Sequence, residues 1–291
     1  MRAGQGSRTA VLVCQGRAAA HGRIAPGVFA DPTALPMLRR DERVPVEQVR
    51  ADAVPSGVAA RVEYEMVKAS AEVVVPRTVA IDQAVRAWAS PQVGILGAGL
   101  DGRAWRLTEL AAATVYEIDH PASQQDKRDR SADLTPVAGT LRWVPVDLSR
   151  DRLDDALDAA GHDTGTPTTW VWEGVVPYLT EAEVEGTVEA LARRSAPGSG
   201  LVVNYQAPGL GAAIGRVAAR GMLLLARSPS LWGDEPRRSA WTARTMGALL
   251  ARHGFVVGTD VDLLTIAAGL PMQVHRRRSL RNGRVATAVR Q

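Results

Sequence analysis

Short apolar runs bounded by turn residues recur from Gln92 to the end of the chain, and longer amphipathic stretches separate them. Buried parallel strands read as such runs, and the stretches between them are typical of crossover helices. The pattern therefore predicts an α/β protein with a doubly wound, mostly parallel sheet of seven strands. The predicted strands are Val93–Leu96, Thr114–Ile118, Leu141–Val146, Trp170–Trp172, Leu201–Tyr205, Val256–Asp262 and Val285–Val289. The last follows the turn signal Asn282-Gly283, so we expect it to pair antiparallel with its predecessor.

The first 90 residues lack this alternation and are predicted to form a helical cap. Asp31-Pro32 is a helix-start signal, with Asp as the cap and Pro at the first helical position. It predicts a helix over residues 33–40. Two further helices are expected over residues 55–75 and 78–88.

We expect one domain over residues 1–291, with the cap at 1–90 and the core at 91–291, because no flexible boundary separates the two. Residues 208–236, after the fifth predicted strand, are rich in Gly, Ala and Leu and include Met222. Glycines weaken helices and permit motion, and the apolar side chains around Met222 offer surface to an apolar ligand. We therefore expect a lid in this segment, and a pair of packing helices is the alternative.

A glycine loop follows the first predicted strand. Gly97, Gly99 and Gly102 form the pattern G-x-G-x-x-G, and two acids, Glu117 and Asp119, end the next strand. Glycines at a strand-to-helix turn let a cofactor approach the backbone, and an acid on the next strand accepts hydrogen bonds from ribose hydroxyls. NAD(P)-dependent oxidoreductases and S-adenosylmethionine-dependent methyltransferases share both needs, so the loop alone predicts a cofactor of either kind.

Charge favours S-adenosylmethionine. A dinucleotide places its pyrophosphate on the first turn of the following helix, where backbone N–H groups and the helix dipole attract an anion. Asp101 stands at that place, and its carboxylate would repel the anion. S-adenosylmethionine has no phosphate and carries a cationic sulfonium and an ammonium. An NAD(P)-dependent oxidoreductase remains the alternative, as does a glycine turn that serves packing alone.

The segments around the loop resemble a known family. Ile95–Leu107, ILGAGLDGRAWRL, and Tyr116–Pro121, YEIDHP, are similar to motifs of the leucine carboxyl methyltransferase family and its bacterial relatives. Further matching motifs cover almost the whole chain in the expected order: Ser7–Ala10, Phe29–Pro32, Pro76–Thr78, Val146–Leu148, Trp172–Leu179 and Val203–Tyr205. The resemblance implies the class I methyltransferase fold, with S-adenosylmethionine as the cofactor.

The resemblance also implies roles for the loop and the two acids. Gly97, Ala98 and Gly99 would lie against the methionine part of the cofactor. Asp119 matches the family's ribose-binding acid. Glu117 lies two positions earlier on the same face of the strand, as a supporting or salt-bridged alternative.

Four more positions follow from the resemblance. Arg77 has the family's position for pairing with the methionine carboxylate, which a guanidinium suits, and Glu173 would face the ammonium. Asp147 and Leu148, after the third strand, would contact the adenine. A helix cap for the segment that begins near Asp151 is the alternative for Asp147.

The acceptor side is less defined. Tyr178 and Tyr205 are candidates for lining it, and a core aromatic is the alternative for each. None of the five histidines lies in a motif that marks a general base, whereas a carboxylate acceptor is ionised at neutral pH and needs none. We therefore expect methyl transfer to a carboxylate or acidic hydroxyl of a small, apolar, polyketide-like metabolite. A protein that binds S-adenosylmethionine without catalysis is the alternative.

Composition argues against other classes. The net charge of +4 comes from 35 basic and 31 acidic residues, and no basic stretch alternates with aromatics, so we expect no nucleic-acid partner. No apolar stretch approaches the ~20 residues of a membrane helix, and the N-terminus lacks the apolar core of a secretory signal. A cytoplasmic protein without a membrane partner is expected. The single cysteine, Cys14, cannot form an internal disulfide or a thiolate metal site, and we expect no metal.

Overall fold

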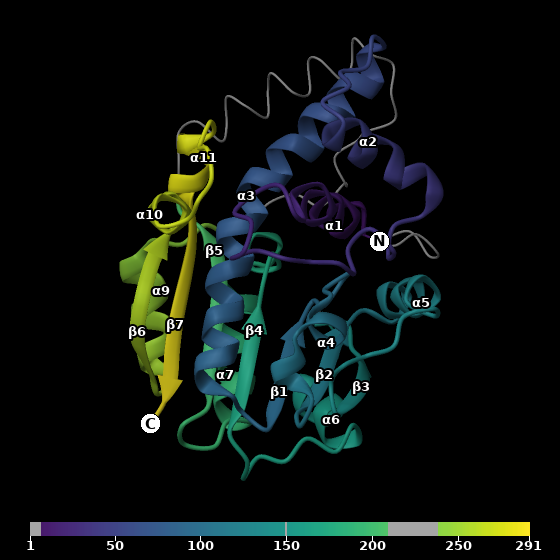
Figure 1. Ribbon diagram of the computed structural model, residues 1–291. Coiled ribbons are helices and arrows are strands. Elements are labelled where there is room, and N and C mark those ends of the chain that lie inside the picture. The colour runs from purple at the N-terminus through teal and green to yellow at the C-terminus, as the bar shows by residue number, and fades with distance from the viewer. Residues whose placement is uncertain (1–6, 149, 209–237) are drawn as a thin grey trace.

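The computed structural model describes residues 7–148, 150–208 and 238–291. Three helices come first in the chain: α1 (Arg8–Ala20), α2 (Arg40–Arg50) and α3 (Val58–Trp88). Helices α1 and α2 lie over one end of the sheet, and the long α3 runs from this cap down along the sheet (Figure 1). The predicted lid lies, apart from Pro208, outside the described residues.

Seven strands form one sheet in the order β3-β2-β1-β4-β5-β7-β6. The strands are β1 (Gln92–Leu96), β2 (Thr114–Asp119), β3 (Thr140–Pro145), β4 (Thr168–Trp172), β5 (Gly200–Gln206), β6 (Phe255–Asp262) and β7 (Gly283–Arg290). Strands β1 to β5 are parallel, and β7 pairs antiparallel with both β5 and β6. The predicted doubly wound sheet is confirmed, including its antiparallel last strand.

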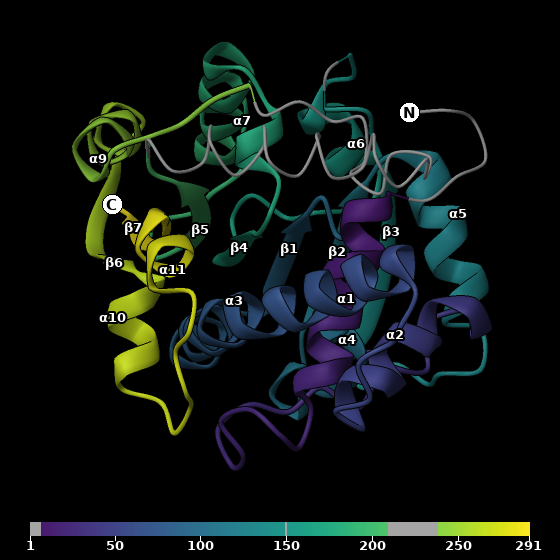
Figure 2. The same cartoon turned by 90° about the horizontal axis from the view of Figure 1, so that it is seen from above.

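Helices cover both faces of the sheet. The remaining ones are α4 (Arg103–Arg106), α5 (Pro121–Arg130), α6 (Leu153–Ala159), α7 (Glu181–Arg193), α9 (Ala243–Arg252), α10 (Leu263–Ala268) and α11 (Arg277–Asn282), with the short 3₁₀ turns η1 (Thr108–Leu110) and η2 (Val176–Tyr178). Seen from above, α3 and α4 lie on one face, and α6, α7 and α9 lie on the other (Figure 2). In the described part of the chain, no helix is both long and apolar enough to cross a membrane.

Each strand contributes side chains to two core layers, because successive residues of a strand point to opposite faces. Val93 and Ile95 of β1 pack in the layer that contains the cap helices, and Leu96 packs in the other layer with Trp170 and Trp172 of β4. Gly94 leaves room for this arrangement, since a Cβ atom there would lie 2.3 Å from the Trp170 ring.

The cap differs from the prediction at Pro76. We expected two helices, over residues 55–75 and 78–88, but one helix of 31 residues passes through Pro76. A proline inside a helix removes one backbone hydrogen bond and strains the preceding turn. Val74, Val75 and Val79 are buried on either side of Pro76, and this packing holds the helix together across the proline.

The helix predicted over residues 33–40 is also absent, and turns occupy residues 32–37 instead. Asp31 does cap this segment: its Oδ1 accepts hydrogen bonds from the backbone N–H groups of Thr33 and Ala34, both at 3.1 Å. Pro36 lacks the N–H that a second helical turn would use, so the helix start is not propagated. Helix α2 begins only at Arg40.

The cap approaches the glycine loop closely at Gly102. A Cβ atom there would lie 2.2 Å from Oγ1 of Thr33 and 3.3 Å from a carboxylate oxygen of Asp31. The third glycine of the loop therefore leaves room for the cap.

We expect Gly102→Ala to destabilise the protein by about 1–3 kcal/mol, because the added methyl group must displace the cap. Gly186→Ala is the matched control: Gly186 lies within helix α7, and nothing lies within 4 Å of its added Cβ. Alanine there should be neutral or stabilise by up to about 1 kcal/mol. Urea unfolding of both variants measures the difference, and equal midpoints would contradict a tight cap contact at Gly102.

Candidate functional site

The glycine loop turns sharply at the carboxyl end of β1. Gly97 and Gly99 have positive φ angles of +61° and +45°. The backbone N–H groups of Gly97 and Ala98 both donate to the carbonyl of Ile118, at 2.7 and 3.2 Å, and tie the loop to the end of β2. A Cβ atom at Gly97 would lie 2.2 Å from the Val175 side chain. Both the backbone conformation and the available space therefore require glycine at this position.

Asp119, the last residue of β2, binds the loop from the other side. Its Oδ2 accepts a hydrogen bond from the N–H of Gly99 at 2.6 Å, and its Oδ1 accepts one from the N–H of His120 at 2.7 Å. Burial raises the pKa of Asp119, against the effect of these two hydrogen bonds. The residue is half-buried, and each carboxylate oxygen can still accept another donor.

Glu117, the other predicted acid, lies in a different environment. It is fully buried and forms an ion pair with Lys127, whose Nζ lies 4.9 Å from the Trp105 ring centroid. Burial raises the pKa of Glu117 to about 7, although Lys127 opposes this shift. The two acids therefore differ in their surroundings: Asp119 borders the glycine loop, whereas Glu117 forms a buried salt bridge with Lys127.

Arg77 and Glu173 meet at the carboxyl end of β4. The Nε atom of Arg77, on α3, donates to Oε1 of Glu173 at 2.6 Å, and both side chains are about one-tenth exposed. Burial alone would favour the neutral acid. The guanidinium groups of Arg77 and Arg103 outweigh it and hold the pKa of Glu173 well below its usual value. Arg77 and Glu173 are therefore in direct contact, although they are predicted to bind the carboxylate and the ammonium of the cofactor's methionine part.

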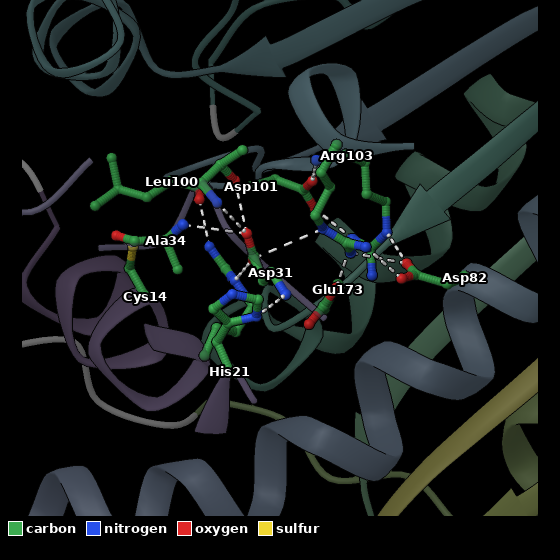
Figure 3. Close-up of polar contacts among 12 residues, drawn as sticks. Cys14, His21, Asp31, Ala34, Asp82, Leu100, Asp101, Arg103 and Glu173 are labelled. Atoms are coloured by element: carbon green, nitrogen blue, oxygen red, sulfur yellow. Dashed lines mark hydrogen bonds and ion pairs between the residues drawn. The ribbon is translucent and has the colours of Figure 1, made fainter. Parts of the chain in front are cut away.

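Arg103, the first residue of α4, contacts three carboxylates from three parts of the chain. Its Nε donates to Asp82 of α3 at 2.8 Å, and its Nη1 donates to Glu173 at 2.8 Å and to Asp101 of the glycine loop. The side chain is only 2% exposed. Arg103 therefore connects the cap helix, the loop and the end of β4 (Figure 3).

The same network continues into the rest of the cap. Arg106 donates to Asp82 at 2.6 Å, and its Nε lies 3.7 Å from Asp31. Arg17 of α1 donates to Asp31 at 2.8 Å and to the carbonyl of Leu100 in the loop. The ion pairs thus join α1, α3 and the loop (Figure 3).

This network of ion pairs is not apparent from the sequence. Its one local signal is Asp82, a charged residue that directly follows the apolar run Val79–Ile81 in a predicted helix. An acid that is buried among apolar residues is expected to have a cationic partner. The partner itself, Arg103, lies 21 positions away and could not be assigned from the pattern.

The structure corrects the role expected for Asp101. We predicted a free carboxylate that repels an anion, but Asp101 is 7% exposed and pairs with Arg103, so its charge is balanced. The helix after the loop, α4, has only four residues. So short a helix aligns few peptide dipoles, and this geometry is a poor site for a pyrophosphate.

Asp147 and Leu148 follow β3 at the carboxyl edge of the parallel strands, the edge at which the glycine loop follows β1. The Asp147 carbonyl accepts hydrogen bonds from the N–H groups of Arg150 and Asp151, which form a turn, and α6 starts later, with Arg152 as its N-cap residue. Asp147 is therefore not the cap of that helix, which was the alternative. Leu148 is half-buried and lines a hollow of about 400 Å³ between α6 and α7.

The two tyrosines have different places. Tyr205 on β5 is fully buried, and its hydroxyl donates to Asp260 at 2.6 Å. Burial and this hydrogen bond raise its pKa. Tyr205 is thus a core residue, which corrects its candidacy as an acceptor contact. Tyr178 is half-buried at the end of η2, five residues after Glu173.

Comparison with known proteins identifies the family. The model of the leucine carboxyl methyltransferase family matches residues 10–192, more than half of the chain. The chain belongs to the leucine carboxyl methyltransferase family. This confirms the resemblance of the motifs, and the chain is a methyltransferase with S-adenosylmethionine as its cofactor.

Individual relatives agree with this assignment. A provisionally named S-adenosyl-L-methionine-dependent methyltransferase of Mycolicibacterium vanbaalenii is 36% identical over 217 residues, which cover 69% of this chain and 67% of that protein. One of Mycobacteroides abscessus is 43% identical over 119 residues, 40% of this chain and 37% of that protein. The solved structure of the methyltransferase SibL, 16% identical, has a TM-score of 0.51 over 83% of this chain and 61% of that chain, and shows the fold.

All five histidines of this methyltransferase are among the described residues. His162 and His253 directly precede the segments that lead into β4 and β6, at the edge of the sheet opposite the glycine loop. His21 lies in the cap, where its Nδ1 accepts a hydrogen bond from the Asp31 N–H at 3.2 Å. His162 and His253 are thus held away from the carboxyl ends of β1, β2 and β4.

The other two histidines are nearer the carboxyl edge. His120 follows Asp119 directly, and its Nδ1 accepts a hydrogen bond from the N–H of Ala122 at 3.2 Å, so it serves as the N-cap of α5. His275 precedes α11, and its backbone N–H donates to Glu72 of α3 at 2.6 Å.

His162 makes stability depend on pH. Burial and Arg194 lower its pKa to about 4, and its Nε2 lies 2.9 Å from Oγ1 of Thr168. An unfolded chain has a histidine pKa near ~6.5, so it binds more protons than the folded state between these pH values. Stability is therefore lost as the pH falls from about 6.5 to about 4.

We expect His162→Gln, which does not titrate, to reduce this loss. Between about pH 7.5 and about pH 5, the free energy of unfolding should fall by about 1–2 kcal/mol less in the variant than in the wild type. Urea unfolding at the two pH values measures the difference. Parallel pH dependences of the two proteins would contradict a neutral, buried His162.

Proposed function

We propose that the protein is an O-methyltransferase that acts on a carboxylate or an acidic hydroxyl of a small, apolar metabolite. The observation that carries the proposal is the placement of the histidines. His162 and His253 lie at the opposite edge of the sheet, and His275 is an exposed residue before α11. The Nδ1 atoms of His21 and His120 each accept a backbone hydrogen bond. A group that is already ionised at neutral pH suits a site without a free imidazole base.

The chain's own residues offer a receptor for each part of the cofactor. We assign the ribose to Asp119, whose two oxygens keep free acceptor capacity, and the methionine part to Gly97, Ala98 and Gly99. The methionine carboxylate and ammonium suit Arg77 and Glu173, which are both charged and lie at one place.

The remaining assignments complete the site. Asp147 and Leu148, at the end of the neighbouring strand β3, are assigned to the adenine: a carboxylate accepts from the exocyclic amine, and a leucine covers the ring. Tyr178 is assigned to the acceptor side, because η2 follows Glu173 in the same loop. We assign no metal to the site.

The protein's task in the reaction is alignment. When bound, S-adenosylmethionine supplies a methyl group that its sulfonium already activates. The residues at the carboxyl edge hold the two reactants in line, which lowers the entropic part of the barrier. No residue has to remove a proton when the acceptor is a carboxylate, and none has to form a covalent intermediate.

The proposed acceptor is apolar because residues 208–236 are rich in Gly, Ala and Leu, a composition suited to covering apolar surface. We propose a polyketide-like metabolite, in a cytoplasmic protein with no nucleic-acid or membrane partner. An NAD(P)-dependent oxidoreductase is disfavoured by the four-residue α4. A non-catalytic protein that binds S-adenosylmethionine would show cofactor binding but no methyl transfer.

We expect Asp119→Ala to weaken binding of S-adenosylmethionine and S-adenosylhomocysteine at least about tenfold, or ~1.4 kcal/mol, because two ribose hydroxyls lose their acceptor. Calorimetric titration measures this effect. Glu109→Gln, which alters an exposed acid on η1, is the control and should bind like the wild type. NADH should not bind. Equal affinities of Asp119→Ala and wild type would contradict the ribose assignment.

The methylated atom can be identified from the product. The protein is incubated with S-adenosylmethionine labelled in its methyl group and with a panel of apolar carboxylic acids, phenols and amines. We expect the label to appear in the methyl ester of a carboxylic acid. A methyl ester releases volatile methanol in alkali, whereas methyl ethers and methylamines do not. Alkali-stable counts from a phenol would move the acceptor to an acidic hydroxyl. Counts from amines alone would contradict the proposal.

A further inference from the structure

We propose that Arg103 is a positioning residue for the cofactor: it holds the Glu173 carboxylate in place while Arg77 turns to bind another anion. The inference rests on the proposed binding of the cofactor's ammonium by Glu173. Arg103 would not touch the cofactor and would act through Glu173.

The two oxygens of Glu173 are held by different arginines. Oε1 accepts from Arg77 at 2.6 Å, and Oε2 accepts from Arg103 at 2.8 Å. The two arginines differ in how many other acids they contact. For Arg77, Glu173 is the one ion-pair partner among the described residues, whereas Arg103 is also bound to Asp82 and Asp101.

This difference decides which arginine can move. Arg77 can exchange one carboxylate for another, so a cofactor carboxylate can take the place of Glu173. Arg103 would have to leave two buried carboxylates at once, and removing the partner of a buried charge is costly. Glu173 therefore keeps one cationic partner throughout binding.

Retaining that partner matters because only about one-tenth of the Glu173 side chain is exposed. A buried carboxylate without a cation tends to take up a proton, and a neutral acid attracts an ammonium weakly. With Arg103 in place, Glu173 stays ionised and its remaining oxygen, freed by Arg77, faces the site. Arg103 also ties Glu173 to Asp101, so the glycine loop and the end of β4 keep their relative positions.

Arg106 provides a matched comparison within the same helix. Like Arg103 it is an arginine of α4 with a buried side chain, 5% exposed, and it also pairs with Asp82. Its second acidic neighbour is Asp31 of the cap, and among the described residues its ion pairs are with Asp31 and Asp82 and none is with Glu173. If substitutions act only by disturbing the structure, replacing either arginine should weaken cofactor binding to a similar extent. If Arg103 positions Glu173, replacing Arg103 should weaken binding more than replacing Arg106.

The experiment measures the affinity for S-adenosylmethionine by calorimetry in the full chain, for wild type, Arg103→Met and Arg106→Met. We expect at least about a tenfold loss of affinity for Arg103→Met and less than about a threefold loss for Arg106→Met. Thermal unfolding should show that both variants are folded and destabilised. Equal losses of affinity would overturn the proposal. No binding to the wild type would overturn the proposed function as well, which distinguishes the two failures.

Combining the substitution with Glu173→Gln tests whether Arg103 acts through Glu173. In the Glu173→Gln background, Arg103→Met should change the affinity by less than about twofold, because the group that it positions is no longer charged. A persistent tenfold effect would overturn the proposal. Should Arg103→Met fail to fold, Arg103→Lys replaces it: the ammonium keeps the charge but cannot contact three carboxylates in the same geometry. Arg103→Lys is then compared with Arg106→Met, and its effect is measured again in the Glu173→Gln background, with the same expected and contradicting outcomes.

Discussion

A buried set of opposite charges holds this molecule together at the point where the cap meets the sheet. Four arginines of the set come from α1, α3 and α4, and four acids come from the cap, the glycine loop and the end of β4: Arg17, Arg77, Arg103, Arg106, Asp31, Asp82, Asp101 and Glu173. Removing one member of such a network leaves a buried charge unpaired and typically costs about 3–5 kcal/mol. The cap and the loop therefore have one mutual arrangement.

This arrangement has a consequence for the proposed chemistry. The amino acid part of S-adenosylmethionine carries one negative and one positive charge, and Arg77 and Glu173 carry the complementary pair. Exchanging their mutual contact for two contacts with the cofactor leaves the charge of the site unchanged. The surrounding pairs keep their partners, so the site can bind a zwitterion without exposing an uncompensated charge.

Much of the architecture was predictable because it depends on local pattern. The seven apolar runs became the seven strands, and the glycines at 97 and 99 became a loop with positive φ angles. The cap was less predictable. Pro76 did not break α3, because packing on both sides of it compensates the lost hydrogen bond, and the start signal at Asp31 led into turns. Both outcomes depend on contacts with distant parts of the chain.

Sequence by itself determined the order of the elements, the glycine loop, the acid at the end of β2 and the family, because each is written in neighbouring residues. Tertiary structure alone decided which charges meet. Arg103 and Glu173 are 70 positions apart, and Glu117 and Asp119, two positions apart, have opposite environments. Periodicity tells which face of a strand a side chain occupies, but the partner on that face comes from another element and is set only when the chain folds.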